Sequence, residues 1–200
     1  GALENHELAR FELARRGAEV LVVDRTEIGH GCSYGNAGWL TPSLAFPLPA
    51  PGVLGQGLLW LFRKDSPLRI EPRLSLDLAR WLWGFVRACD AARFRRGLEA
   101  LTPLSLASFE EFRRLALTSG FDTGLVESGR LSICETTATL DAERHEIEIL
   151  ARFGLEARLL DADEVRARVP ALVGPVAGAL LTPGDATIEP LAAVHAIAAE

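Results

Sequence analysis

The chain has 200 residues, of which 48% are hydrophobic and 24% charged, and its net charge at pH 7 is −6. This composition is typical of a folded globular protein and excludes a disordered chain. The negative net charge argues against a nucleic-acid partner, because no basic field is available to neutralise phosphates.

The cysteines and the uncharged segments bear on where the protein acts. Cys32, Cys89 and Cys134 lie far apart, and so sparse and odd a set predicts a reducing compartment, which we take to be the cytoplasm. Residues 28–62 carry no charge, yet they hold four prolines and seven glycines, too many for a membrane-spanning helix. This segment is therefore predicted to be an ordered loop that leads into a short helix.

The first predicted elements are a helix and a buried strand. The helix covers residues 4–16 and ends at Gly17, since glycine adopts a left-handed C-cap at little cost. The apolar run 19–23 predicts a strand buried on both faces of a parallel sheet. A strand that follows a helix so closely is half of a βαβ unit. We expect the other half before Gly1, outside this sequence.

The rest of the chain predicts helices alternating with short strands. After a loop from Asp24 to Pro51, strands at 121–127 and 130–134 flank Ser128-Gly129 and predict a hairpin. Asp161 is predicted to cap a short helix that stops before Pro170. The remaining predicted helices are 52–63, 75–89, 97–119, 138–153 and one from Glu189, and the remaining strands are 157–160 and 177–182.

Tryptophans and arginines gather in the middle of the chain. One interpretation is a patch that touches a membrane surface. The other, which we favour from the sequence, is a buried aromatic core with exposed arginines. The residues concerned are Trp60, Trp81, Trp83, Arg80, Arg87, Arg93, Arg95 and Arg96.

Two features indicate nucleotide binding. Asp24 ends the predicted strand, where an acid in a dinucleotide-binding unit accepts hydrogen bonds from ribose hydroxyls, although it also suits a simple turn cap. Ser33, Asn36, Ala37 and Gly38 follow in the loop that leaves the same strand end. Small residues there let the backbone approach a pyrophosphate or a ring system, and a plain turn is the alternative. His30 and Cys32, by contrast, are too few to predict a metal site.

The segment Cys32-Ser-Tyr-Gly-Asn-Ala-Gly-Trp-Leu-Thr-Pro42 resembles the segment after the second strand of FAD-dependent D-amino acid dehydrogenases, a branch of the D-amino acid oxidase and glycine oxidase-like flavoproteins. Supporting matches are Phe11–Val20, Val23–Arg25, Ala50–Val53 and Gly178–Asp185. The resemblance implies an incomplete α/β nucleotide-binding domain of the Rossmann-like FAD type, joined to an α+β substrate domain with a mostly antiparallel sheet. It assigns residues 1–45 to the FAD-binding domain, 46–183 to the substrate domain with a helical excursion at 52–119, and 184–200 to the return.

The resemblance also implies a chemistry. The family oxidises the C–N bond of a D-amino acid to a 2-oxo acid and ammonia, with FAD as cofactor and a membrane quinone as an electron acceptor, which would place the protein at the inner membrane. The substrate-gripping residues lie mainly beyond Glu200, so no catalytic residue is predicted. The implied cofactor contacts are Gly1, Asp24, Arg25, Ser33, Asn36, Ala37 and Gly38.

The start of the chain departs from the family pattern. The three fingerprint glycines should fall at positions 1, 3 and 6, where the chain has Gly1, Leu3 and His6. Leu3 would obstruct the phosphate and His6 would push the helix off the strand. Two alternatives stay open: a related flavoenzyme acting on glycine, sarcosine or proline derivatives, and an inactive remnant unable to hold FAD.

Overall fold

The computed structural model describes residues 12–23, 25, 27–55, 75–118 and 122–199. These residues form two compact units. The first unit joins the beginning of the chain, up to Ser43, to the segment from Leu106 onward, and the second unit is the segment Leu44–Ser105. The domain boundaries expected from the sequence differ from these units and stay a prediction.

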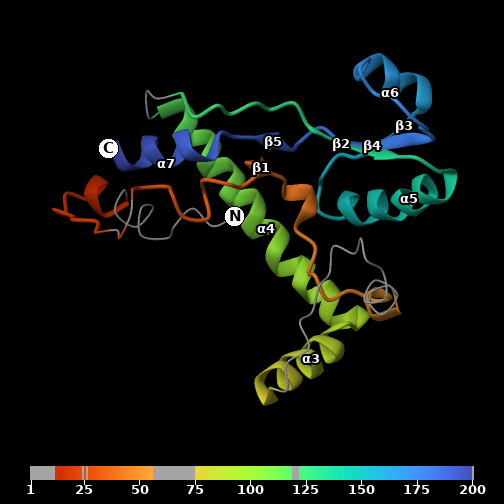
Figure 1. The fold of residues 1–200 in the computed structure, drawn as a ribbon, viewed down its shortest axis with the longest axis horizontal. Helices are drawn as coiled ribbons and strands as arrows, with labels where there is room; N and C mark the ends of the chain where they lie inside the picture. Colours follow the sequence, from red (N-terminus) through yellow and green to blue (C-terminus); the bar gives the residue numbers. More distant parts are fainter. Residues whose placement is uncertain (1–11, 24, 26, 56–74, 119–121, 200) are drawn as a thin grey trace. The chain divides into compact units, whose positions relative to one another are not determined.

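A three-stranded antiparallel sheet organises the first unit (Figure 1). Strand β4 (Gly178–Thr182) lies in the centre, between β2 (Arg130–Cys134) and β3 (Arg158–Asp161). In the register, Leu131 faces Leu181 and Leu160 faces Ala179. Because alternate residues of a strand point to opposite faces, β4 buries side chains on both sides of the sheet.

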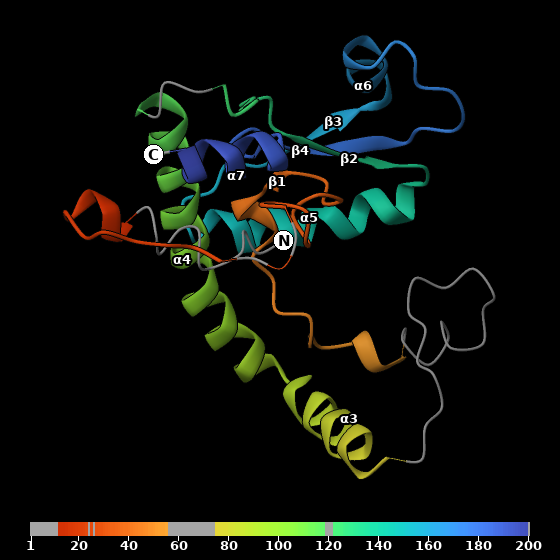
Figure 2. The ribbon, with the colours of Figure 1, turned by 60° about the vertical axis from the view of Figure 1, so that its left-hand side comes forward.

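Two helices cover the two faces of this sheet (Figures 1 and 2). Helix α6 (Ala162–Arg168) buries Val165 against Leu160 and Ala179 on one face. Helix α5 (Thr137–Ala151) lies on the other face, where a Cβ on Gly178 would come within 2.8 Å of Leu140 Cδ2. The predicted strands 130–134, 157–160 and 177–182 and both predicted helices are confirmed.

The predicted hairpin is wrong. Residues 122–127 contribute only an isolated bridge from Val126 to Thr187, and β2 pairs with β4 instead of with a preceding strand. Gly129 has φ +76, and a Cβ there would lie 3.0 Å from Thr182 O. The glycine therefore permits a close approach to the end of β4 rather than a two-residue turn.

A second antiparallel pair joins distant parts of the first unit. Strand β1 (Trp39–Leu40) pairs with β5 (Ala186–Thr187), and helix α7 (Pro190–Ala199) follows directly. Helix α7 is buried along most of its length, and its Ile197 packs on Leu115. The helix predicted from Glu189 is confirmed, and a short 3-10 helix, η1 (Pro42–Leu44), follows β1.

The strand predicted at 19–23 is wrong. These residues take no strand conformation, and Leu21 and Val23 are largely exposed. Every strand pair among the described residues is antiparallel, so the parallel part of the expected Rossmann-like sheet does not form there. A buried parallel strand needs neighbours on both edges and a layer on both faces, and its apolar composition alone cannot supply them.

The helix before this segment ends as predicted. Residues 12–15 are helical, and Gly17 has φ +82. The Ala18 N–H donates to Leu13 O and the Gly17 N–H to Ala14 O, which is the Schellman arrangement of hydrogen bonds. Residues 4–11 of the predicted helix lie outside the described part of the chain.

The second unit is helical among its described residues. Helix α3 (Leu76–Ala88) begins where predicted, since the Leu78 N–H donates to Ser75 Oγ at 3.4 Å. Helix α4 (Ala91–Thr118) begins earlier than the predicted residue 97, because Asp90 accepts hydrogen bonds from two backbone N–H groups of its first turn. It continues into the first unit, and Pro103 lies inside it near the boundary between the units.

The predicted aromatic core of the second unit is wrong for two of its three tryptophans. Trp81 and Trp83 are exposed, and Trp60 lies outside the described residues. Buried contacts come instead from the loop before the masked-free helices, where Phe46 stacks on Phe94 and Pro47 packs on Gly97. No helix that the structure describes is long and apolar enough to cross a membrane.

Candidate functional site

The loop 27–38 packs against helix α7, which brings the sequence-predicted serine, asparagine and glycine to the buried side of the first unit. A Cβ on Gly29 would come within 2.7 Å of Leu191 Cδ1. His195 Nε2 lies 3.4 Å from Ile28 O, within hydrogen-bond distance. His30 stacks on Tyr34, with the ring centroids 4.9 Å apart, at the exposed edge of the same loop.

Gly38 is required by the backbone. Its φ is +64, and a Cβ there would lie 1.9 Å from Ile188 O. The Ile188 N–H donates to Gly38 O at 2.8 Å, which fixes β1 next to the start of α7. No other residue fits this position without moving one of the two segments.

Asn36 stabilises the same bend. Its Oδ1 accepts a hydrogen bond of 2.6 Å from the Gly38 N–H. That backbone N–H, which the sequence analysis offered to a phosphate or a ring, therefore already has a partner within the loop. Asn36 remains half-buried beside a pocket, and Ala37 is exposed.

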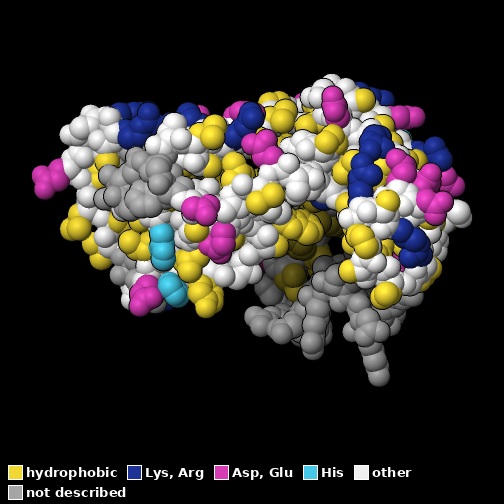
Figure 3. All heavy atoms as spheres, turned by 90° about the horizontal axis from the view of Figure 1, so that it is seen from above, with side chains coloured by type: hydrophobic (Ala, Val, Ile, Leu, Met, Phe, Trp, Pro, Cys, Tyr) yellow, Lys and Arg dark blue, Asp and Glu magenta, His cyan; other side chains and the backbone are white. Residues whose placement is uncertain are grey.

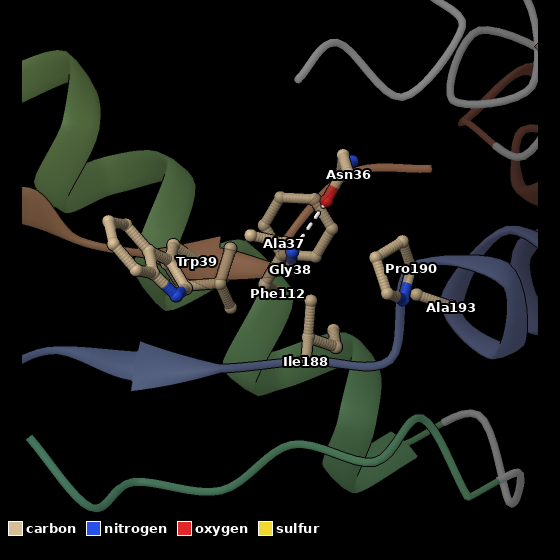
Figure 4. Close-up of a pocket in the computed structure, with 9 residues that line it drawn as sticks. Asn36, Ala37, Gly38, Trp39, Phe112, Ile188, Pro190 and Ala193 are labelled. Atoms are coloured by element: carbon tan, nitrogen blue, oxygen red, sulfur yellow. Dashed lines mark hydrogen bonds between the residues drawn. The ribbon is translucent and has the colours of Figure 1, made fainter. Parts of the chain in front are cut away.

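The pocket has a volume of about 190 Å³. It is lined by residues 36–40, by Phe112 of α4, and by Ile188, Pro190 and Ala193 around the start of α7 (Figure 4). Pockets that enclose a whole organic ligand usually measure about 300–1,000 Å³, so this one has room for part of a large cofactor. Its lining is mostly apolar, with amide and backbone groups at one end, which suits a flat aromatic ring.

Ser33 lies upstream of this pocket and is the least satisfied polar residue of the loop. It is 0% exposed, and its hydroxyl has no hydrogen-bond partner. Leaving a buried hydroxyl unpaired costs about 1–3 kcal/mol, so native proteins rarely keep one without a reason. A ligand oxygen or nitrogen that reaches Ser33 would remove this cost, and the loop therefore fits a polar cofactor.

The structure unites only part of the predicted cofactor site. Asn36, Ala37 and Gly38 come together at the pocket, whereas Ser33 and the exposed Arg25 are not among the residues that line it. Gly1 and Asp24 lie outside the described residues. Whether the acid and the loop hold two ends of one nucleotide stays a prediction.

The sequence analysis missed a buried polar cluster around Asp185. This carboxylate is 2% exposed and accepts four hydrogen bonds. Ser43 donates from its N–H at 3.2 Å and from its Oγ at 2.5 Å, Thr182 Oγ1 donates at 2.7 Å and Arg130 Nε at 3.3 Å. The cluster thus joins η1, β2 and the turn after β4.

Arg130 connects this cluster to helix α5. Its Nη2 lies 3.4 Å from Glu146 Oε1, and its Nη1 donates to Ser132 Oγ. Burial and the neighbouring Glu143 raise the pKa of Glu146 to about 7, and Arg130 opposes that rise. The available sequence signal was an acid directly after a buried strand, but it gave no sign of partners 55 and 142 residues away.

Comparisons with known proteins agree with this loop and sheet. Residues 9–200 match the sequence model of the family described as FAD dependent oxidoreductase. The chain belongs to this family. The match leaves out residues 1–8, the region where the fingerprint glycines are missing.

Curated relatives share about a third of the residues. A D-amino acid dehydrogenase of Neisseria meningitidis is 36% identical over 179 residues, which cover 88% of this chain and 43% of the relative. D-amino acid dehydrogenase 2 of Ralstonia nicotianae is 37% identical over 182 residues, covering 88% and 42%. The chain therefore spans less than half of the length of these relatives.

Solved structures give the fold. Glycine oxidase from Geobacillus kaustophilus superposes with a TM-score of 0.61 at 22% identity, over 96% of this chain and 40% of the oxidase. Glycine oxidase from Bacillus cereus superposes with a TM-score of 0.57 at 18% identity, over 96% and 39%. The chain thus has part of the glycine oxidase-like fold, with its antiparallel sheet.

Proposed function

We propose that this chain forms part of an FAD-dependent enzyme that oxidises the C–N bond of a D-amino acid to a 2-oxo acid and ammonia. The buried, unpartnered hydroxyl of Ser33, next to the pocket at Asn36–Gly38, carries the proposal. D-amino acid dehydrogenases among the relatives supply the substrate class. A membrane quinone is the proposed final electron acceptor, and a Rossmann-like sheet is the proposed surrounding of residues 12–38.

The residues of this chain would bind the cofactor rather than react. When bound, FAD accepts the hydride from the substrate. Ser33 would hydrogen-bond a polar atom of the cofactor, and the apolar wall of Phe112 and Ile188 would keep water from the pocket. Gly38 would hold the loop close to α7, so that this wall keeps its shape.

The first test is FAD binding. We expect titration of the purified protein with FAD to quench flavin fluorescence, and Ser33→Ala to weaken binding by about 1–2 kcal/mol, the value of one hydrogen bond to a buried group. Ser128→Ala, at an exposed serine, is the matched control and should bind like the unchanged protein. Equal affinity in Ser33→Ala would remove the serine from the cofactor site, and no binding at all would favour the inactive remnant.

The second test separates the substrates. The FAD-loaded protein is given D-amino acids, glycine, sarcosine or proline with an artificial electron acceptor, and ammonia release is measured. Turnover of D-alanine or another D-amino acid well above glycine supports the proposal. Preference for glycine, sarcosine or proline would replace the substrate class while leaving the cofactor site intact.

A further inference from the structure

We propose that helix α3 docks the protein onto an anionic phospholipid surface. The inference stands apart from the proposed function, because it concerns the second unit and is tested without flavin or turnover. Helix α3 is labelled in Figures 1 and 2. It has 13 residues, and none of them is buried.

The first observation is the outer face of α3. The side chains at positions 76, 80, 83 and 87 follow one another at intervals of four, three and four residues, so they form a single stripe along the helix. The stripe consists of Leu76, Arg80, Trp83 and Arg87, and Leu76 and Trp83 are 79% and 64% exposed. The partly buried residues Leu78, Leu82 and Phe85 lie on the opposite side. Both faces of α3 are therefore apolar in part, which a helix facing only water does not need.

The second observation is the distribution of charge. The second unit, residues 44–105, has nine basic and five acidic residues, a net charge of +4, whereas the remainder of the chain has 12 basic and 22 acidic residues, a net charge of −10. Acidic and basic side chains are intermixed on the face shown in Figure 3. Within the part of the chain that the structure describes, no acidic side chain forms an ion pair with Arg87, Arg95 or Arg96. A basic unit in an acidic chain complements an anionic surface.

The order of residues along the stripe favours lipid over a protein partner. Protein interfaces gather their apolar anchors in a central, dry patch with charges around the rim. In the stripe of α3, leucine and tryptophan alternate with arginines. At a bilayer surface this order is favourable, because the apolar rings enter the headgroup layer while arginines at the same depth pair with phosphates. Since no described helix could cross a bilayer, the contact would be peripheral.

Vesicle binding tests the proposal. The purified protein is sedimented with vesicles of phosphatidylcholine alone or with added phosphatidylglycerol, at low and high salt, and tryptophan emission is recorded. We expect binding to the phosphatidylglycerol vesicles that weakens with salt, accompanied by a blue shift. Arg80→Gln with Arg87→Gln should weaken binding about 25-fold, since each arginine near such a surface contributes about fivefold. Trp83→Ala should weaken it about tenfold.

Matched controls make the outcome decisive. Trp39→Ala removes a tryptophan that is 61% exposed in the first unit, and Arg144→Gln removes an exposed arginine of α5; both should bind within twofold of the unchanged protein. The paired arginine variant changes only exposed side chains, so it keeps the test valid if Trp83→Ala fails to fold. Absence of binding at low salt, equal binding to neutral vesicles, or full binding by the α3 variants would each overturn the proposal. An acidic protein partner would then be the better explanation of the stripe.

Discussion

Ser33 and Asp185 are both buried in the first unit, yet their surroundings are opposite. Asp185 accepts four hydrogen bonds, from Ser43, Thr182 and Arg130, and is complete as the chain stands. Ser33 accepts and donates none. A buried polar group that is fully paired contributes to the fold, whereas one that is unpaired destabilises it and indicates a missing partner. The difference separates a structural cluster from a binding loop.

The largest effect should come from breaking the paired side of this comparison. Asp185→Ala leaves the Arg130 guanidinium largely buried without its nearest carboxylate, and we expect the free energy of unfolding to fall by about 3–5 kcal/mol. Urea unfolding measures the loss. The control Asp141→Ala breaks an exposed ion pair with Arg144 and should cost less than about 1 kcal/mol. Similar losses in both variants would show that the buried cluster contributes nothing special.

Gly38→Ala should follow, because it attacks the contact that shapes the pocket. The added Cβ would overlap Ile188 O, and the left-handed backbone is unfavourable for alanine, so we expect a loss of about 2–4 kcal/mol. Gly17→Ala is the control, since φ is +82 there but nothing lies within 4 Å of the Cβ. It should cost only about 1 kcal/mol. Thermal unfolding distinguishes the two, and equal costs would mean that backbone strain alone matters at Gly38.

Glu146 predicts a pH dependence within the paired cluster. Its pKa in the folded protein is raised to about 7 from 4.5, so folding favours the protonated carboxyl. The stability from this group is therefore full below about pH 4.5 and is lost as the pH rises through 7. Glu146→Gln should be more stable than the unchanged protein by about 2 kcal/mol at pH 8 and equal to it at pH 4. Unfolding measured across this range would contradict the idea if the difference did not change with pH.

The smallest effect on stability should come from the unpaired side. Without FAD, Ser33→Ala removes a hydroxyl that has no partner, so the free energy of unfolding should stay unchanged or rise by up to about 1 kcal/mol. Differential scanning calorimetry in the absence of flavin measures it. A clear loss of stability would mean that the hydroxyl has a partner in the free protein, and the contrast with Asp185 would disappear.

The helices were predicted well because their signals are local. Ser75 and Asp161 accept hydrogen bonds from N–H groups three residues ahead, and Gly17 ends its helix through bonds to residues just behind it. Such contacts lie within one turn of chain and can be recognised from spacing. The start of α4 was placed too late only because the cap formed by Asp90 was overlooked.

The site was predicted in part for a related reason. The small residues Asn36, Ala37 and Gly38 were correctly singled out, but Gly38 meets the backbone at Ile188, 150 positions along the chain, and no local pattern announces that neighbour. The apolar run 19–23 was misplaced in a buried strand because apolar composition states a preference for burial without supplying the covering segments.

By itself the sequence determined the helices and their caps, the individual sheet strands 130–134, 157–160 and 177–182, and the similarity to FAD-dependent oxidoreductases that the family match confirmed. Only the tertiary structure decided that β2 pairs with β4, that Asp185 is saturated and that Ser33 is not. Capping and helix periodicity depend on neighbours a few residues apart. Strand pairing and hydrogen-bond satisfaction depend on which distant segments share the interior, and that is fixed when the chain packs.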